Sequence, residues 1–234
     1  MNLRRLITAV VLAALCAGFL YQIGLLGMVV WFNFRDPSNT PVMQDTLYAL
    51  RAHDSKARLD HEWVPYARIS THLKRAVIAS EDSGFMEHDG VEWDAIRKAW
   101  SYNQRQEALG RTRRRGGSTI TQQLAKNLFL SNSRNYLRKG QELILTYMIE
   151  AVMSKRRILE LYLNVAQWGV ATFGAQAAAR HYFKTDAARL SSAQAAQLAA
   201  MLPNPAYYDQ HGVTGYLRSH AATVRARMPQ VAVP

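Results

Sequence analysis

Two neighbouring carboxylates, Glu81 and Asp82, are the first candidates for chemistry, because they follow a segment whose apolar residues have helical spacing. The helix dipole disfavours negative charge at a C-terminus, so both side chains carry an electrostatic cost there. If such a carboxylate is partly buried, its pKa rises and it can act as a general base or acid. An ordinary solvated loop has the same composition, and the sequence leaves that alternative open.

A second candidate site begins at Gly116 and Gly117, directly before another helical segment for which we expect Ser118 to be the cap. Two glycines at a helix start allow close approach to exposed main-chain N–H groups, which suits an anion. Four arginines stand just upstream: Arg111, Arg113, Arg114 and Arg115. Four polar residues share one face of the helix by their spacing: Thr119, Gln123, Lys126 and Asn127. The pattern suits a sugar-phosphate ligand, although a capped amphipathic helix with a solvated face is its commoner use.

A third cluster consists of Arg138, Lys139 and Glu142 at the start of a long helical stretch. Their spacing is that of two surface ion pairs, which contribute roughly 0.2–0.5 kcal/mol each. The alternative is a carboxylate that stays ionised between cations while those cations bind phosphate.

Several other classes of site are absent from the sequence. There is no Gly-Lys-Ser/Thr phosphate loop, no His-Glu-x-x-His, no Gly-x-Ser-x-Gly, and no Ser-x-x-Lys with Lys-Thr-Gly. Their absence argues against a nucleotide cradle, a zinc protease, a serine hydrolase and penicillin-binding acyl transfer. The single cysteine, Cys16, excludes an intramolecular disulfide framework and a cysteine-based zinc site.

The elements that must position these residues are helices. Apolar residues recur at helical spacing in eight stretches: 69–77, 93–100, 120–128, 138–153, 158–163, 174–182, 192–202 and 216–228. We expect Trp93 and Trp100 on the buried face of the second stretch, and Pro203 and Pro205 to stop the seventh. Alternating strand patterns are nearly absent, so the sequence predicts an all-α globular domain.

The N-terminal region predicts a membrane anchor, because residues 6–34 hold no charged side chain and roughly 20 apolar residues suffice to span a bilayer. Arg4 and Arg5 favour a cytoplasmic N-terminus with the rest of the chain outside. A cleaved signal peptide is the alternative, but its apolar region would have about 7–15 residues. We therefore divide the chain into a cytoplasmic tip and anchor at 1–35, a linker leading into the domain at 36–66, and a catalytic domain at 67–234.

The formal charge of +12 favours a polyanionic partner such as nucleic acid, anionic lipid or a phosphorylated substrate. An extracytoplasmic domain disfavours nucleic acid. We expect the basic run 155–157 to face anionic headgroups.

Taken in order, these segments resemble glycosyltransferase family 51, the peptidoglycan glycosyltransferases. Residues 81–90 fit Glu-Asp-x-x-Phe-x-x-His-x-Gly, and residues 116–127 fit Gly-Gly-Ser-Thr-Ile-Thr-Gln-Gln-x-x-Lys-Asn. Residues 138–142 fit Arg-Lys-x-x-Glu, and residues 155–164 fit Lys-x-x-Ile-Leu-Glu-x-Tyr-Leu-Asn. The resemblance covers roughly residues 60–210, and the arginine-rich loop 104–115 departs from it by its length.

The resemblance implies a lysozyme-like, two-lobed helical domain that polymerises lipid II on the outer face of the inner membrane. The reaction it implies forms a β-1,4 bond with inversion at the N-acetylmuramic acid anomeric carbon and releases undecaprenyl pyrophosphate. The short chain and the missing acyl-transfer motifs imply the monofunctional biosynthetic type. Its partners would be lipid II, the growing glycan strand and the membrane, with division or elongation proteins as further candidates and no nucleic acid.

The resemblance also implies roles for individual residues. Glu81 would be the general base and Glu142 a second catalytic glutamate that assists departure of the pyrophosphate. The implied substrate-binding residues are Asp82, Phe85, His88, Ser118, Thr119, Gln123, Lys126, Asn127, Arg138 and Lys139. A divalent cation, Mg²⁺, would sit near the pyrophosphate on Asp82 and Glu142. Two rival functions remain: a lytic, lysozyme-like enzyme that also uses two carboxylates, and a membrane-tethered anion binder without enzymatic activity.

Overall fold

The computed structural model describes residues 3–111, 116–131 and 136–234. Its α-helices are α1 (Leu3–Phe34), α2 (Pro41–Arg51), α3 (Thr71–Glu81), α4 (Trp93–Ala108), α5 (Ile120–Phe129), α6 (Tyr136–Val152), α7 (Lys155–Val165), α8 (Ala175–Phe183), α9 (Ser192–Met201), α10 (Pro205–His211) and α11 (Gly215–Arg227). Two short strands, β1 (Asp60–His61) and β2 (Thr172–Phe173), pair in parallel. The prediction of an all-α domain behind one long N-terminal helix is confirmed.

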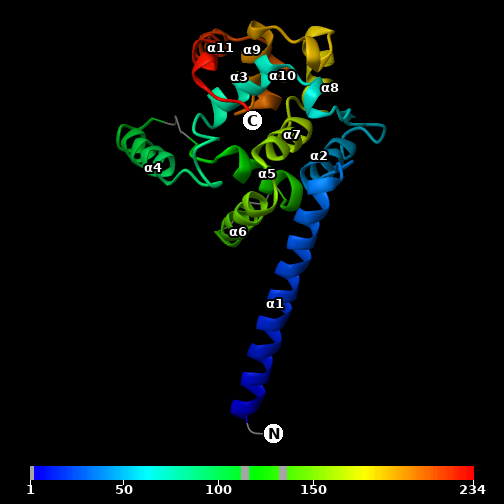
Figure 1. Cartoon of the computed structure of the whole chain (residues 1–234), viewed down its shortest axis with the longest axis vertical. Coiled ribbons are helices and arrows are strands. Elements are labelled where there is room, and N and C mark those ends of the chain that lie inside the picture. The colour runs from blue at the N-terminus through cyan, green and yellow to red at the C-terminus, as the bar shows by residue number, and fades with distance from the viewer. Residues whose placement is uncertain (1–2, 112–115, 132–135) are drawn as a thin grey trace.

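The globular body consists of two groups of packed helices (Figure 1). Helices α3, α9 and α11 pack on one another at the end far from the N-terminus, and α5 packs on α6, α7 and α2 nearer to α1. Buried residues from both groups form one continuous hydrophobic core. This arrangement agrees with the predicted two lobes.

Helix α5 begins at Ile120, one residue later than it would with Ser118 as its cap. Thr119, not Ser118, is the N-cap: its hydroxyl accepts from the N–H of Gln122, and the Gln122 side chain accepts from the N–H of Thr119. This reciprocal pair satisfies two N–H groups of the first turn and fixes where the helix starts. The apolar stripe on α5 is buried as predicted, with Ile120 and Leu124 fully inside.

The segment 36–66 is part of the folded body, which differs from the linker that we expected. Pro41 stands in the first turn of α2, where its missing N–H costs nothing, and Thr40 caps that helix. Val42 and Met43 are buried against the core. Pro205 has the same role at the start of α10, so the proline that was expected to end one helix begins the next.

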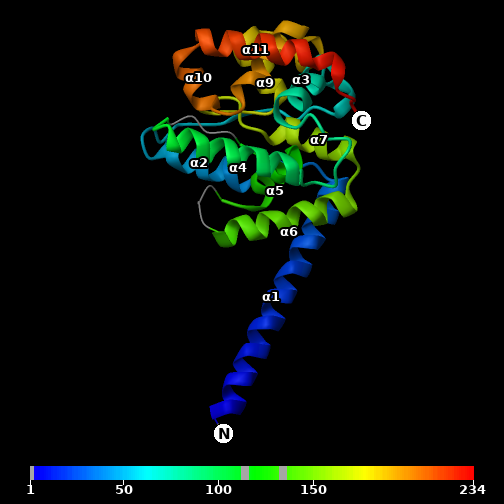
Figure 2. The same cartoon turned by 90° about the vertical axis from the view of Figure 1, so that its left-hand side faces the viewer.

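Helix α4 exposes the aromatic residues that we expected it to bury. Trp93 is 53% exposed and Trp100 is 67% exposed, and Ala99 is the one buried residue of this helix. The apolar spacing is real, but α4 lies at the edge of the body, where little covers that face (Figures 1 and 2).

Helix α1 projects from the body as a long apolar rod and is a candidate membrane-spanning helix by length and composition (Figure 2). Its C-terminal part packs on the domain, because Leu25 and Val29 are buried and the Phe32 ring contacts that of Phe129. Gln22 and Gln141 of α6 exchange two amide hydrogen bonds, at 2.7 and 3.1 Å. Helix α1 is therefore joined directly to the helix that carries Glu142.

The basic run 155–157 has internal partners, which differs from the expected role toward headgroups. Arg157 donates to the main-chain oxygens of Phe32 and Arg35 and pairs with Asp36 and Glu160. These contacts hold the end of α1 against α7, so the charge of Arg157 supports the position of α1 on the domain.

Replacing Gln22 with Leu should weaken the packing of α1 on α6, because the Gln141 amide then loses its hydrogen-bond partner on α1. We expect a loss of roughly 1 kcal/mol, seen as a lower unfolding temperature of the full chain in detergent. The double variant Gln22→Leu with Gln141→Leu should recover most of the loss, because no amide is then left unpaired. An unchanged unfolding temperature in the single variant would show that the amide pair does not hold α1 in place.

Candidate active site

Glu81 is the last residue of α3 and lies against the side of α5. Its Oε2 accepts a hydrogen bond from Nε2 of Gln123 at 2.9 Å, and the Ser80 hydroxyl lies 3.4 Å from Oε1. Burial raises the pKa of the Glu81 carboxyl, the hydrogen bonds from Gln123 and Ser80 lower it, and the charge of Asp82 raises it, with a net upward shift. A carboxylate with a raised pKa is a better proton acceptor near neutral pH, so this geometry supports a general base.

Asp82 joins the end of α3 to the start of α5. It is 4% exposed, and its Oδ2 accepts the main-chain N–H of Ile120 at 3.0 Å. Its Oδ1 lies 2.8 Å from Nε2 of His88. The anion that the helix N-terminus attracts is thus Asp82 itself.

This arrangement corrects two expectations for the start of α5. Asp82 accepts the N–H of Ile120 and the Thr119 hydroxyl accepts that of Gln122, so these two N–H groups of the first turn are not free to bind a phosphate. Gly117 is needed for packing instead, since a Cβ there would lie 3.0 Å from Cα of Ile96 in α4.

Three residues that we assigned to substrate binding, Asp82, Phe85 and Thr119, lie inside the protein. Phe85 is fully buried in the core, and the ammonium of Lys155 stands 4.8 Å from its ring centroid. Thr119 is 3% exposed and donates its hydroxyl to the carbonyl of Gly90 at 2.6 Å. Their side chains support the loop 81–90 and cannot reach a substrate in this conformation.

Glu142 belongs to a separate cluster on α6. It is 3% exposed, its Oε2 accepts from Arg138 at 2.9 Å, and its Oε1 pairs with Lys139. The ammonium of Lys139 also lies 3.4 Å from the Ser118 hydroxyl. Since Glu142 is buried, these are not simple surface pairs: the carboxylate holds two cations in fixed positions, and about half of the Lys139 side chain stays exposed.

Two pockets of about 210 Å³ contain the remaining predicted residues. The first is lined by Ser118 and Lys139 together with Trp100 of α4. The second is lined by three residues of the polar face of α5: Gln123, Lys126 and Asn127. Its other wall includes Pro203 and Pro205, so it lies between the two helix groups. Gln123, Lys126 and Asn127 therefore face one pocket, which agrees with their spacing, and their role in substrate binding stays a prediction.

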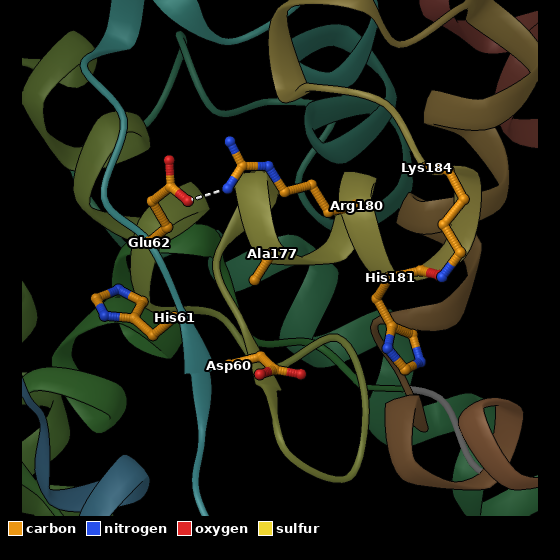
Figure 3. A pocket seen from close by; sticks show the side chains of 7 residues that line it. All are labelled: Asp60, His61, Glu62, Ala177, Arg180, His181 and Lys184. Atoms are coloured by element: carbon orange, nitrogen blue, oxygen red, sulfur yellow. Dashed lines mark hydrogen bonds and ion pairs between the residues drawn. The ribbon is translucent and has the colours of Figure 1, made fainter.

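A larger open pocket of about 400 Å³ lies elsewhere, between β1 and α8 (Figure 3). Asp60 and His61 line one side, and Arg180, which pairs with Glu62, and His181 line the other. No residue of the four segments that resemble the family (81–90, 116–127, 138–142 and 155–164) lines this pocket. Its size alone therefore does not make it the reaction site.

The residues expected to hold Mg²⁺ do not fit an ion as they stand. The oxygens of Asp82 accept from His88 and from Ile120, and those of Glu142 accept from Arg138 and Lys139. A cation would have to displace charged or main-chain donors on both carboxylates. In the described ranges, the one group of potential ligands within 4.8 Å of one another is Asp82, His88 and Glu92.

The fourth sequence segment supplies a site residue that we missed. We interpreted 155–164 as a structural helix with a polar end, and Asn164 does bond to both main-chain groups of Val64. Tyr162, however, donates its hydroxyl to Oε1 of Gln123 at 2.9 Å and lines the pocket beside Lys126. Its place in an apolar helical pattern predicted a core residue and gave no sign of this contact.

The arginine-rich loop 104–115 is only partly placed. Arg111 is exposed after the end of α4 and donates its main-chain N–H to the carbonyl of Gln106. Arg113, Arg114 and Arg115 lie outside the described residues, so their predicted role near the site stays a prediction.

The domain is helical and two-lobed, with one carboxylate of raised pKa and a second carboxylate paired with two cations, which suits an enzyme that acts on glycosyl groups. The family model described as Transglycosylase matches residues 49–229, and the chain belongs to this transglycosylase family. The chain is 64% identical to the biosynthetic peptidoglycan transglycosylase of Bordetella pertussis over 234 residues, which is 100% of this chain and 97% of that protein. It is 49% identical to the protein of the same name from Herminiimonas arsenicoxydans over 232 residues, 99% of each chain. It is 53% identical to that from Aromatoleum aromaticum over 226 residues, 96% of each.

His88 should make stability depend on pH. Burial lowers the pKa of its imidazole, but the hydrogen bond and charge of Asp82 outweigh burial, and the net shift is upward. Lys155 lowers this pKa and Glu150 raises it by smaller amounts. A raised folded-state pKa stabilises the fold fully below the unfolded value of about 6.5, and this contribution is lost as pH rises through the folded pKa.

Replacing His88 with Gln should therefore lower the unfolding temperature more at pH 5.5 than at pH 8.5. Gln keeps a donor for Asp82 but carries no titrating charge. The exposed His72 on α3 is the matched control, and its replacement with Gln should change the unfolding temperature little at either pH. Equal losses for His88→Gln at both pH values would contradict the proposed charge pairing.

Proposed function

We propose that this enzyme polymerises lipid II into glycan strands of peptidoglycan. The relatives with full-length similarity are named biosynthetic peptidoglycan transglycosylases. The single observation that carries the proposal is the division of labour between two carboxylates. Glu81 has a raised pKa at the side of α5, while Glu142 holds two cations on α6.

Glu81 acts as the general base. It accepts the proton from the 4-hydroxyl of the acceptor's N-acetylglucosamine as the oxygen attacks the anomeric carbon of the N-acetylmuramic acid that ends the growing chain. The C–O bond to undecaprenyl pyrophosphate breaks as the new bond forms, so the α linkage becomes β-1,4 by inversion. Gln123 holds the carboxylate in place with the hydrogen bond to Oε2.

The departing pyrophosphate needs compensation for growing negative charge. Lys126 lines the pocket that Gln123 shares, and Lys139 lines the neighbouring pocket with Ser118. Arg138 and Lys139 are held by Glu142, so their cationic groups are in position before the substrate arrives. Preorganised charges of this kind stabilise a transition state without reorganisation during the reaction.

The anchor places this reaction at a membrane. We propose that α1 spans the inner membrane with Arg4 and Arg5 on the cytoplasmic side, and that the catalytic domain lies outside. The docking of α1 on α6 supports this, because it brings the site close to the bilayer surface, where a lipid-linked substrate is delivered.

Replacing Glu81 with Gln should abolish polymer formation from purified lipid II, with a loss of about 10²–10⁴-fold in rate, because the base is removed while its shape is kept. The wild-type rate should fall as pH drops through the raised pKa of Glu81. Glu87, exposed in the same loop, is the matched control, and its replacement with Gln should leave the rate unchanged. The unfolding temperature of each variant shows whether it folds.

Polymerisation by Glu81→Gln at the wild-type rate would contradict the assignment of the base. A chain that shortens finished glycan strands and does not extend lipid II would instead support the lytic alternative.

A further inference from the structure

We propose that Tyr162 is a positioning residue for the reaction: its buried hydroxyl fixes the orientation of the Gln123 amide, and the amide in turn fixes and activates Glu81. This inference rests on the proposed function, in which Glu81 is the general base. It adds a third residue, from α7, to a contact that otherwise joins α3 and α5.

The hydrogen bonds run in one direction through three side chains. The Tyr162 hydroxyl donates to Oε1 of Gln123 at 2.9 Å, and Nε2 of Gln123 donates to Oε2 of Glu81 at 2.9 Å. Tyr162 is 1% exposed, so no solvent competes for its hydroxyl. An amide has one accepting and one donating end, and the residue that occupies the accepting end decides which end the other neighbour meets.

The Tyr162 hydroxyl keeps the proton that it donates to Gln123. Burial raises the pKa of its phenol well above the ordinary value, and the negative charges of Glu81 and Asp82 raise it further. The hydroxyl therefore keeps its proton across the whole range in which the enzyme can work. An ionised Glu81 can only accept, so the amide satisfies both neighbours when Nε2 donates to Glu81 and Oε1 accepts the proton of Tyr162.

Loss of this hydroxyl would allow the amide of Gln123 to turn over. Its oxygen would then face the oxygens of Glu81, which is favourable only when Glu81 is protonated. The other groups around Glu81 do not replace the lost donor: Asp82 is negative, and the Ser80 hydroxyl is shared between Oε1 of Glu81 and the carbonyl of Ala199 in α9, at 3.4 and 3.3 Å. Lys126, which lines the same pocket as Gln123, stays as a nearby positive charge in both orientations.

The test is the pH dependence of kcat/KM for lipid II polymerisation by the full chain in detergent. Replacing Tyr162 with Phe should move the acidic limb of the profile upward by roughly 0.5–1 pH unit, because Glu81 then protonates more readily. Activity above that limb should be largely kept. Tyr208 of α10, which lies outside both site pockets, is the control, and Tyr208→Phe should leave the limb in place.

A double-mutant cycle separates positioning from packing. In a Gln123→Ala background, Tyr162→Phe should cause no further movement of the acidic limb, since the amide that transmits the effect is absent. A lower unfolding temperature with an unmoved limb in the single variant would overturn the proposal, because it would show a purely structural tyrosine. An equal movement in both backgrounds would also overturn it.

Failure of the underlying function gives a different result. If Glu81→Gln keeps both the wild-type rate and the wild-type acidic limb, the limb does not report Glu81, and the assignment of Glu81 as the base fails, whatever Tyr162 does. If Glu81→Gln is inactive and Tyr162→Phe keeps the wild-type limb, only the role of Tyr162 fails.

Discussion

The carboxylate of Asp82 is the contact on which the site depends. It accepts from His88 within its own loop and from the first N–H of α5, so the C-terminus of α3 is held to the N-terminus of α5. A negative charge is unfavourable at the C-terminus of α3 and favourable at the N-terminus of α5, so the contact with α5 offsets the cost at α3. Glu81, one residue earlier, is thereby placed beside Gln123.

The rest of the site follows from where α5 lies. Its apolar stripe is buried, so its polar face must turn toward the pocket between the two helix groups. Helix α7 packs behind it and delivers Tyr162, while α6 packs beside it and delivers the cations around Glu142. The two carboxylates thus occupy different electrostatic environments because they belong to different helices.

Sequence reasoning identified the helices and the polar residues well, because both depend on local spacing. The stripe of Ile120 and Leu124 and the cluster around Glu142 were predictable from periodicity and charge. Phe85 and Thr119 were misassigned, since a motif shows that a residue type is required and not whether its side chain points inward. Tyr162 was missed because its place in an apolar helical pattern predicts a core residue. Only the packing of α7 on α5 shows that its hydroxyl contacts Gln123.

The excess of positive charge has more than one role. Arg138 and Lys139 lie at the proposed leaving-group site, whereas Arg157 fastens the end of α1 to the domain. The most direct test of the whole account gives the purified full chain lipid II in one reaction and finished glycan strands in another, and follows chain length in both. We expect strands that lengthen from lipid II, with one pyrophosphate-linked lipid released per bond, and no change in the finished strands. Shortening of the finished strands, or release of the lipid without new bonds, would contradict it.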